Sequence, residues 1–277
     1  MKMRLHTLLF ATLLVSLVSC TDLEEELVGE ITESLSVEYN GPVCDCGGGI
    51  EPAAFSYTTL RNIGTANHGG DFSLQELTSD EMVLPVRGED WNHTASFIQL
   101  HRHTYGPDHP SLNNVFRALY DGIDRTNYVL HEWHYSPSDV DIAKTRVIRA
   151  YLHWRLLDLF GRVRIVTGEG ENPPQSSRQE VFEFVEGELL DVLGVTELHP
   201  DMDLSGSLLP ESSIAYEMNR YGALGILAKL YLNAEVYTGT PMYDKAEIAA
   251  SYIIDSGHSL IAHYSPSRRH SLTRIRG

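Results

Sequence analysis

The stretch that decides the fold is Asp141–Gly161, whose sequence is DIAKTRVIRAYLHWRLLDLFG. Most positions from Val147 to Phe160 are apolar or aromatic, and neither proline nor glycine interrupts them. A helix of these residues is apolar around most of its circumference, which is typical of a helix enclosed by neighbours. The stretch is too short and too often charged to span a bilayer. Since Gly161 stands where a C-cap glycine belongs, we predict a buried central helix that ends there.

The charged residues of this helix divide between its faces. At 100° per residue, Arg146, Arg149 and His153 share one side, whereas Arg155 and Asp158 lie on others. Because the polar residues form no single stripe, the pattern favours a helix wedged into a helical stack.

Other helices are expected on both sides of it. Ser177 with Glu180 forms a capping box that opens a helix ending at Leu193. Residues 71–109 have mixed polarity and predict a long ordered loop with local helix. We expect an all-α, tetratricopeptide-like helical repeat core, whose other helices cover Pro52–Asn67, Ser111–Tyr135, Pro210–Thr238 and Pro241–Ser256.

Composition excludes some functions. The 277 residues carry 21 Lys+Arg against 38 Asp+Glu, a formal net charge of −17. Such an acidic chain is unsuited to a phosphate backbone, so we expect no nucleic-acid partner. No GxSxG, HExxH, GxGxxG or P-loop pattern is present, and Glu186 and Glu188 point to different faces of their helix. We therefore expect no catalytic residues and no cofactor. His101 and His103 lack carboxylates at matching spacing, so we expect no metal site.

The beginning of the chain has the pattern of a bacterial lipoprotein signal. A short basic segment and an apolar run precede Leu17-Val18-Ser19-Cys20, which indicates a signal peptide over residues 1–19 and acylation of Cys20. The acidic residues after Cys20 begin a tether and leader over residues 20–52. The alternative is an ordinary secretory signal with a chance cysteine.

The segment TSDEMVLPVRGEDWN, residues 78–92, is the candidate binding loop. An aromatic face can stack on the apolar side of a sugar ring, while planar charged and amide groups bond its hydroxyls. The predicted sugar-binding residues are Asp80, Arg87, Trp91 and Asn92. In the alternative, Trp91 packs the loop against the helices and Arg87 pairs with Asp90.

Five linked motifs in the chain resemble the SusD/RagB family of glycan-binding surface lipoproteins of Bacteroidota. They lie within Thr78–Trp91, Leu119–Asn127, Arg149–Gly161, Ser177–Phe182 and Ala228–Gly239. The resemblance implies a SusD-like N-terminal domain over residues 53–260. It also implies a non-enzymatic protein that captures oligosaccharides on the outer membrane and passes them to a SusC-like TonB-dependent transporter. Alternatives are a lipid-anchored protein–protein scaffold, a lipid-anchored glycoside hydrolase, or a non-functional fragment of a SusD-like protein.

The end of the chain departs from that pattern. Residues 261–277 turn basic and lose helical periodicity, so we expect an atypical tail and a core that is incomplete at its C-terminus. A natural basic tail is the alternative. If no helix pair follows Pro241–Ser256, we expect Ile248, Ile253 and Ile254 to be exposed together, so that the chain is prone to association.

Overall fold

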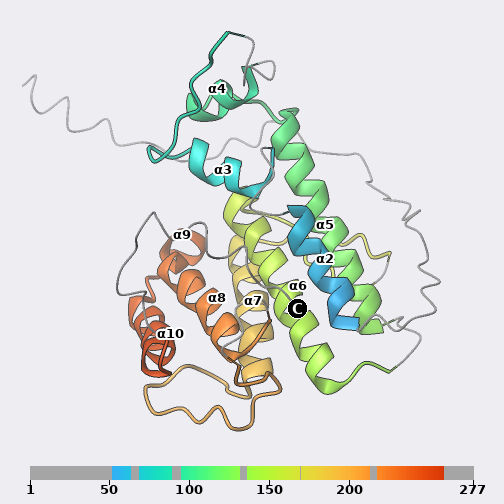
Figure 1. The fold of residues 1–277 in the computed structure, drawn as a ribbon, viewed down its shortest axis with the longest axis vertical. Helices are drawn as coiled ribbons and strands as arrows, with labels where there is room; N and C mark the ends of the chain where they lie inside the picture. The colour runs from blue at the N-terminus through green and yellow to red at the C-terminus, as the bar shows by residue number, and fades with distance from the viewer. Residues whose placement is uncertain are drawn as a thin grey trace, which may run out of the picture. The chain divides into compact units, whose positions relative to one another are not determined.

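The computed structural model describes residues 52–63, 69–88, 95–131, 136–168, 170–212 and 217–258. The regular elements in these ranges are all α-helices, which confirms the predicted all-α class (Figure 1). None of them combines the length and the apolar character that a bilayer span requires. The helices are α2 (Pro52–Ile63), α3 (Asp71–Leu77), α4 (Ser96–His101), α5 (Pro110–His131), α6 (Asp139–Phe160), α7 (Arg178–Leu193), α8 (Arg220–Leu232), α9 (Ala234–Thr238) and α10 (Tyr243–Asp255).

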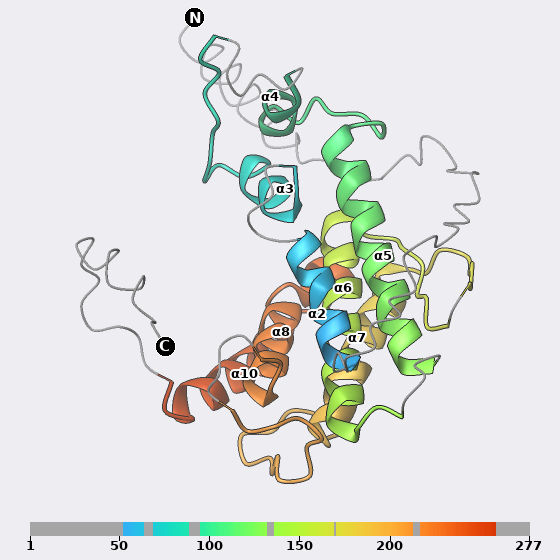
Figure 2. The same cartoon turned by 45° about the vertical axis from the view of Figure 1, so that its right-hand side comes forward.

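The longer helices stack mainly in chain order, as in a helical repeat. Helix α5 packs on α6, α6 on α7, α7 on α8 and α8 on α10, while α2 lies against both α5 and α6. Figure 2 shows the same neighbours from a second direction. Each helix of such a stack buries its apolar face on the next one, which is the packing that the paired helices predict.

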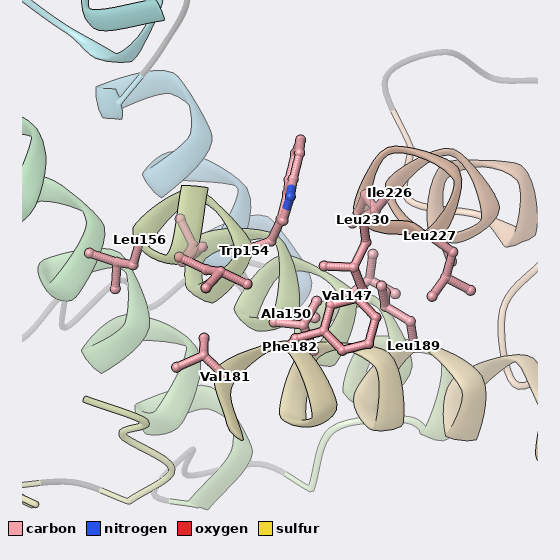
Figure 3. Close-up of a cluster of buried hydrophobic side chains, with 14 of the residues drawn as sticks. Val147, Ala150, Trp154, Leu156, Val181, Phe182, Leu189, Ile226, Leu227 and Leu230 are labelled. Carbon is pink, nitrogen blue, oxygen red and sulfur yellow. The ribbon is translucent and has the colours of Figure 1, made fainter. Parts of the chain in front are cut away.

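Helix α6 is the buried centre of the stack, as predicted. It contacts α2, α5, α7 and α8, and side chains from α6, α7 and α8 converge in one hydrophobic cluster (Figure 3). Ala150 of α6, Phe182 of α7 and Leu227 of α8 are all buried there. The all-round apolar pattern of α6 follows from this position, because the helix has neighbours on most sides.

Both predicted helix boundaries on the central pair are confirmed. Gly161 closes α6 at φ +73°, and its N–H donates to the Leu157 carbonyl. At the start of α7 the Ser177 hydroxyl accepts from the Glu180 N–H while the Glu180 carboxylate accepts from the Ser177 N–H. These bonds satisfy backbone groups that a helix end leaves without partners.

The prediction of one long helix over Pro210–Thr238 is wrong. Helix α8 begins only at Arg220, because Asn219 is extended and its side chain accepts from the Gly222 N–H at 2.9 Å. The same element breaks again at Asn233, whose side-chain amide donates to the Lys229 carbonyl at 3.0 Å. Asparagine side chains compete with the helix ladder for backbone groups, and this competition ends α8 before α9 starts.

The expected exposed isoleucine face of α10 is also wrong in part. Ile248 and Ile253 pack against the core beside α8, and only Ile254 is exposed. Helix α10 therefore uses α8 as its apolar partner. Two other predicted helix ends, residues 64–67 and 132–135, lie outside the described residues.

Candidate functional site

A buried ion pair positions the segment that leads into the candidate loop. Arg155 of α6 donates through Nη2 to Asp71 Oδ1 at 2.6 Å, and its Nε lies 3.1 Å from Asp71 Oδ2. Asp71 is the first residue of α3, and the Arg155 side chain is only 2% exposed. Since a buried charge is tolerated only with its partner, this pair fixes the start of α3 on the central helix.

The same guanidinium makes a second, partly buried contact. Its Nη1 donates to Asp158 Oδ2 at 2.7 Å, and Asp158 Oδ1 accepts from the Tyr237 hydroxyl at 2.6 Å. Burial, followed by the bond to Asp158, raises the pKa of Tyr237 and keeps it a neutral donor. Asp158 and Tyr237 both belong to the family motifs, so these motif residues stabilise the core.

The candidate loop leaves α3 from an ordered turn. Thr78 follows α3, and its hydroxyl donates to the Leu74 carbonyl at 2.5 Å. The Thr78 carbonyl in turn accepts from His103 Nε2 at 2.8 Å, which ties the loop to the turn after α4. Helices α6 and α4 therefore hold the loop at its beginning.

Beyond that turn the loop is open to solvent. Asp80 and Arg87 are both exposed, and within the described residues neither makes a hydrogen bond or an ion pair through its side chain. Met82 and Leu84 pack inward against the core, whereas Val83 is 60% exposed. Within the described residues, the loop thus presents two charged side chains without partners on a backbone that Met82 and Leu84 anchor.

The other predicted site residues cannot be placed in the same way. Trp91 and Asn92 lie outside the described residues, as do Asp90 and the predicted lipidation site Cys20. Their roles in sugar binding and anchoring stay predictions, and so does the alternative pairing of Arg87 with Asp90.

A second polar network lies between α6 and α7, where the sequence pattern indicated only a charged side of α6. Arg149 donates to Glu188 Oε2 at 2.8 Å and to Asn127 Oδ1 at 3.0 Å. Arg146 donates to the other oxygen of Glu188 at 2.8 Å. The predicted side shared by Arg146, Arg149 and His153 is thus the side that meets α7. The charge of Glu188 on α7 was the available signal for this network. Its arginine partners are some 40 residues away in the sequence, so the pairing could not be predicted from it.

Glu186 and Glu188 lie on different faces of α7, as predicted. Glu186 accepts from the Tyr231 hydroxyl at 2.8 Å and from Lys245 at 3.2 Å, on the side of α8 and α10. Glu188 is occupied by the two arginines of α6. The two carboxylates therefore cannot flank one glycosidic bond as an acid and base pair.

Two histidines of the region that was considered for a metal site are bonded to backbone carbonyls. His103 is bonded to the Thr78 carbonyl and His109 Nε2 lies 3.1 Å from the Ser96 carbonyl. In the described part of the chain no three His, Cys, Asp or Glu side chains are grouped to hold a metal ion. His93 lies outside that part.

A surface hollow lies apart from the candidate loop, on α10. Its lining includes Pro200, Tyr252 and the acidic residues Asp244, Glu247 and Asp255. Among the described residues, Tyr252 is the one aromatic residue that lines this hollow, and its hydroxyl is bonded to the Met202 carbonyl. We therefore keep the candidate site at residues 78–92.

The fold and this loop define a helical-repeat protein that presents an anchored, polar surface loop. A family model described as starch-binding associating with outer membrane, of the SusD-like type, matches residues 58–232. The chain belongs to this SusD-like family.

Individual relatives agree with that assignment. The starch-binding protein SusD of Bacteroides thetaiotaomicron is 27% identical over 199 residues, which cover 70% of this chain and 33% of SusD. A laminarin-binding SusD-like protein has a similar fold, with a TM-score of 0.59, 18% identity, and coverage of 76% of this chain and 45% of its own. Surface glycan-binding protein A from Bacteroides fluxus also has a similar fold, with a TM-score of 0.57 and 19% identity. The match covers 76% of this chain and 44% of that protein. The chain thus spans a third of its curated relative and less than half of these solved structures.

Proposed function

We propose that this chain binds oligosaccharides at the cell surface and passes them to a SusC-like TonB-dependent transporter of the outer membrane. Cys20 carries the lipid anchor, and the sugar contacts come from Asp80, Arg87, Trp91 and Asn92. The protein acts by binding and not by catalysis. The family description and the names of the relatives support the class of ligand.

The exposure of the candidate loop is the observation that carries this proposal. Asp80 and Arg87 face solvent, although the loop begins at a turn fixed by the Arg155–Asp71 pair and the His103–Thr78 bond. Because the backbone at the start of the loop is already fixed, ligand binding orders the two side chains but little of this backbone. Carboxylate and guanidinium groups also match the hydroxyls of a sugar as acceptor and donor.

A protein–protein scaffold is the second candidate function. Leu232 and Val236 are 57% and 68% exposed and lie four residues apart, on either side of the break at Asn233 between α8 and α9. Exposed apolar neighbours are a feature of interaction surfaces. A glycan array separates the two functions, because a pure scaffold retains no oligosaccharide. A reducing-end assay on the retained sugars then tests whether the protein hydrolyses them.

Trp91→Ala in the mature chain is expected to weaken oligosaccharide binding about 5- to 30-fold in calorimetry. Loss of one aromatic stacking face removes on the order of 1–2 kcal/mol, and 1.4 kcal/mol is a factor of ten. Val83→Ala is the matched control, because Val83 is exposed on the same loop and lacks an aromatic face. If Trp91→Ala instead lowers Tm by many degrees, Trp91 packs in the core and the alternative holds.

Cys20→Ala is expected to move the protein from the membrane fraction to the soluble fraction. Acyl chains contribute about 0.8 kcal/mol per buried methylene, and the variant has no thiol to acylate at that position. Fractionation with an antibody measures the distribution, and a strain lacking the partner transporter removes retention through that partner. A variant that stays in the membrane fraction of this strain would contradict lipid anchoring at Cys20.

A further inference from the structure

The turn after α4 presents an exposed aromatic ring between two histidines. Tyr105 is 39% exposed, and its ring centroid lies 6.3 Å from that of His103 and 6.2 Å from that of His109. Isolated exposed aromatic residues are common on protein surfaces. Tyr105 differs from them because ring contacts hold it on two sides. We call His103, Tyr105 and His109 the Tyr105 platform.

The backbone beneath this platform is fixed by hydrogen bonds. The Thr104 N–H donates to the Gln99 carbonyl at 3.0 Å, and the His109 N–H donates to the Gly106 carbonyl at 3.1 Å. His109 is itself buried and bonded to the Ser96 carbonyl. The exposed ring therefore sits on a rigid base, which is the arrangement that makes an aromatic contact effective in binding.

His103 adds a strained backbone to the platform. Its φ of +53° lies in the left-handed region, which non-glycine residues seldom adopt. Such conformations cost free energy and tend to occur where a side chain must point in a particular direction. Here the conformation accompanies a contact on each side of the imidazole, the Thr78 carbonyl and the Tyr105 ring.

This contact brings the platform to the candidate loop. His103 Nε2 lies 2.8 Å from the Thr78 carbonyl, although the two residues are 25 positions apart. Asp80 follows Thr78 by two residues, so their Cα atoms are at most about 7 Å apart. The Tyr105 ring is therefore joined, through His103, to the loop backbone two residues before Asp80.

We propose that the Tyr105 platform is part of the oligosaccharide-binding surface, with Tyr105 stacking on the C–H face of a neutral pyranose. The inference rests on the proposed function and extends its site from residues 78–92 to the turn after α4. The exposed ring supplies the apolar contact, and the Tyr105 hydroxyl, which has no partner within the described residues, supplies a hydrogen bond.

Calorimetry on the mature chain tests this proposal with oligosaccharides that an array of neutral glycans retains, including maltohexaose and laminarihexaose. Tyr105→Ala is expected to weaken binding about tenfold or more, and Tyr105→Phe to retain most of it because the stacking face remains. Tyr243→Ala is the matched control, since Tyr243 is a 53% exposed tyrosine on α10.

A second measurement needs no variant. Tetranitromethane nitrates accessible tyrosines, and peptide mass spectrometry reports each site separately. Saturating oligosaccharide is expected to protect Tyr105 and to leave Tyr243 as reactive as before. This readout decides the matter if Tyr105→Ala fails to fold.

The outcomes separate the two proposals. If the wild-type chain binds sugar while Tyr105→Ala binds equally well and Tyr105 gains no protection, the platform is no part of the site and the proposed function stands. If the wild-type chain retains no glycan on the array, both proposals are overturned. Loss of binding in Tyr105→Ala and Tyr243→Ala alike also counts against a specific role for the platform.

Discussion

Replacing Arg155 by methionine is expected to lower the free energy of unfolding by about 3–5 kcal/mol. Methionine fills much of the same space but leaves the Asp71 and Asp158 carboxylates without the guanidinium that bonds both of them. Asp71 lies in a buried position at the start of α3. Breaking a buried pair by removing one partner leaves an uncompensated charge, which accounts for the large loss.

Urea denaturation of Arg155→Met beside Asp191→Ala measures this effect. Asp191 pairs with Arg146 at 2.5 Å, but its side chain is 68% exposed, so its loss is expected to cost no more than about 1 kcal/mol. Arg155→Met combined with Asp71→Leu is expected to recover part of the stability, because the buried charge leaves with its partner. Equal small losses in both single variants would show that Arg155 does not fix α3 on α6.

Acid is expected to destabilise the protein through His153 by roughly 2–3 kcal/mol between pH 7 and pH 4.5. His153 is fully buried on α6; its Nδ1 lies 2.9 Å from the Arg149 carbonyl, and the Val166 N–H donates to its Nε2 at 3.3 Å. The carbonyl only accepts, so Nδ1 carries the proton and the ring is neutral. Burial is the main cause that lowers the pKa of His153 to about 4; the bond to the Arg149 carbonyl opposes it, the Arg149 charge adds to it, and Glu188 opposes it.

The direction of the effect follows from the two pKa values. In the unfolded chain His153 takes up a proton below about pH 6.5, whereas in the folded protein it stays neutral down to about pH 4. The unfolded state thus binds more protons in this range, so the contribution is fully present above pH 6.5 and is lost as the pH falls towards 4.

His153→Gln isolates this contribution from other titrating groups. Glutamine can also donate and accept a hydrogen bond, but it does not titrate. In urea denaturation at pH 7 and pH 4.5, the wild type is expected to lose roughly 2–3 kcal/mol more than this variant. His199→Gln is the control, because its side chain is 61% exposed. If wild type and His153→Gln lose the same stability with acid, His153 is charged in the fold or open to water.

Local sequence patterns determined much of the helical framework. The uninterrupted apolar run of α6 predicted its burial, because a helix that is apolar on most sides needs neighbours on most sides. Gly161 and the Ser177–Glu180 box marked helix ends, because capping depends on residues within a few positions. The same local rules failed at Asn219 and Asn233, where side-chain bonds to the backbone break an otherwise helical pattern.

For the candidate site, the sequence determined which residue types lie in the loop of residues 78–92, and its motifs indicated the family of the chain. Only the tertiary structure showed that Asp80 and Arg87 are exposed, and that His103 joins the loop to the Tyr105 platform.

The buried ion pairs could not be predicted from the sequence, for a physical reason. Arg155 and Asp71 are 84 residues apart, and a charged residue in a helix reads as solvent-facing until its partner is known. Whether such a charge is buried depends on a counter-charge that another helix brings to it, as Glu188 of α7 does for Arg149. Periodicity records the faces of one helix, and only the packing of the helices decides which charges meet.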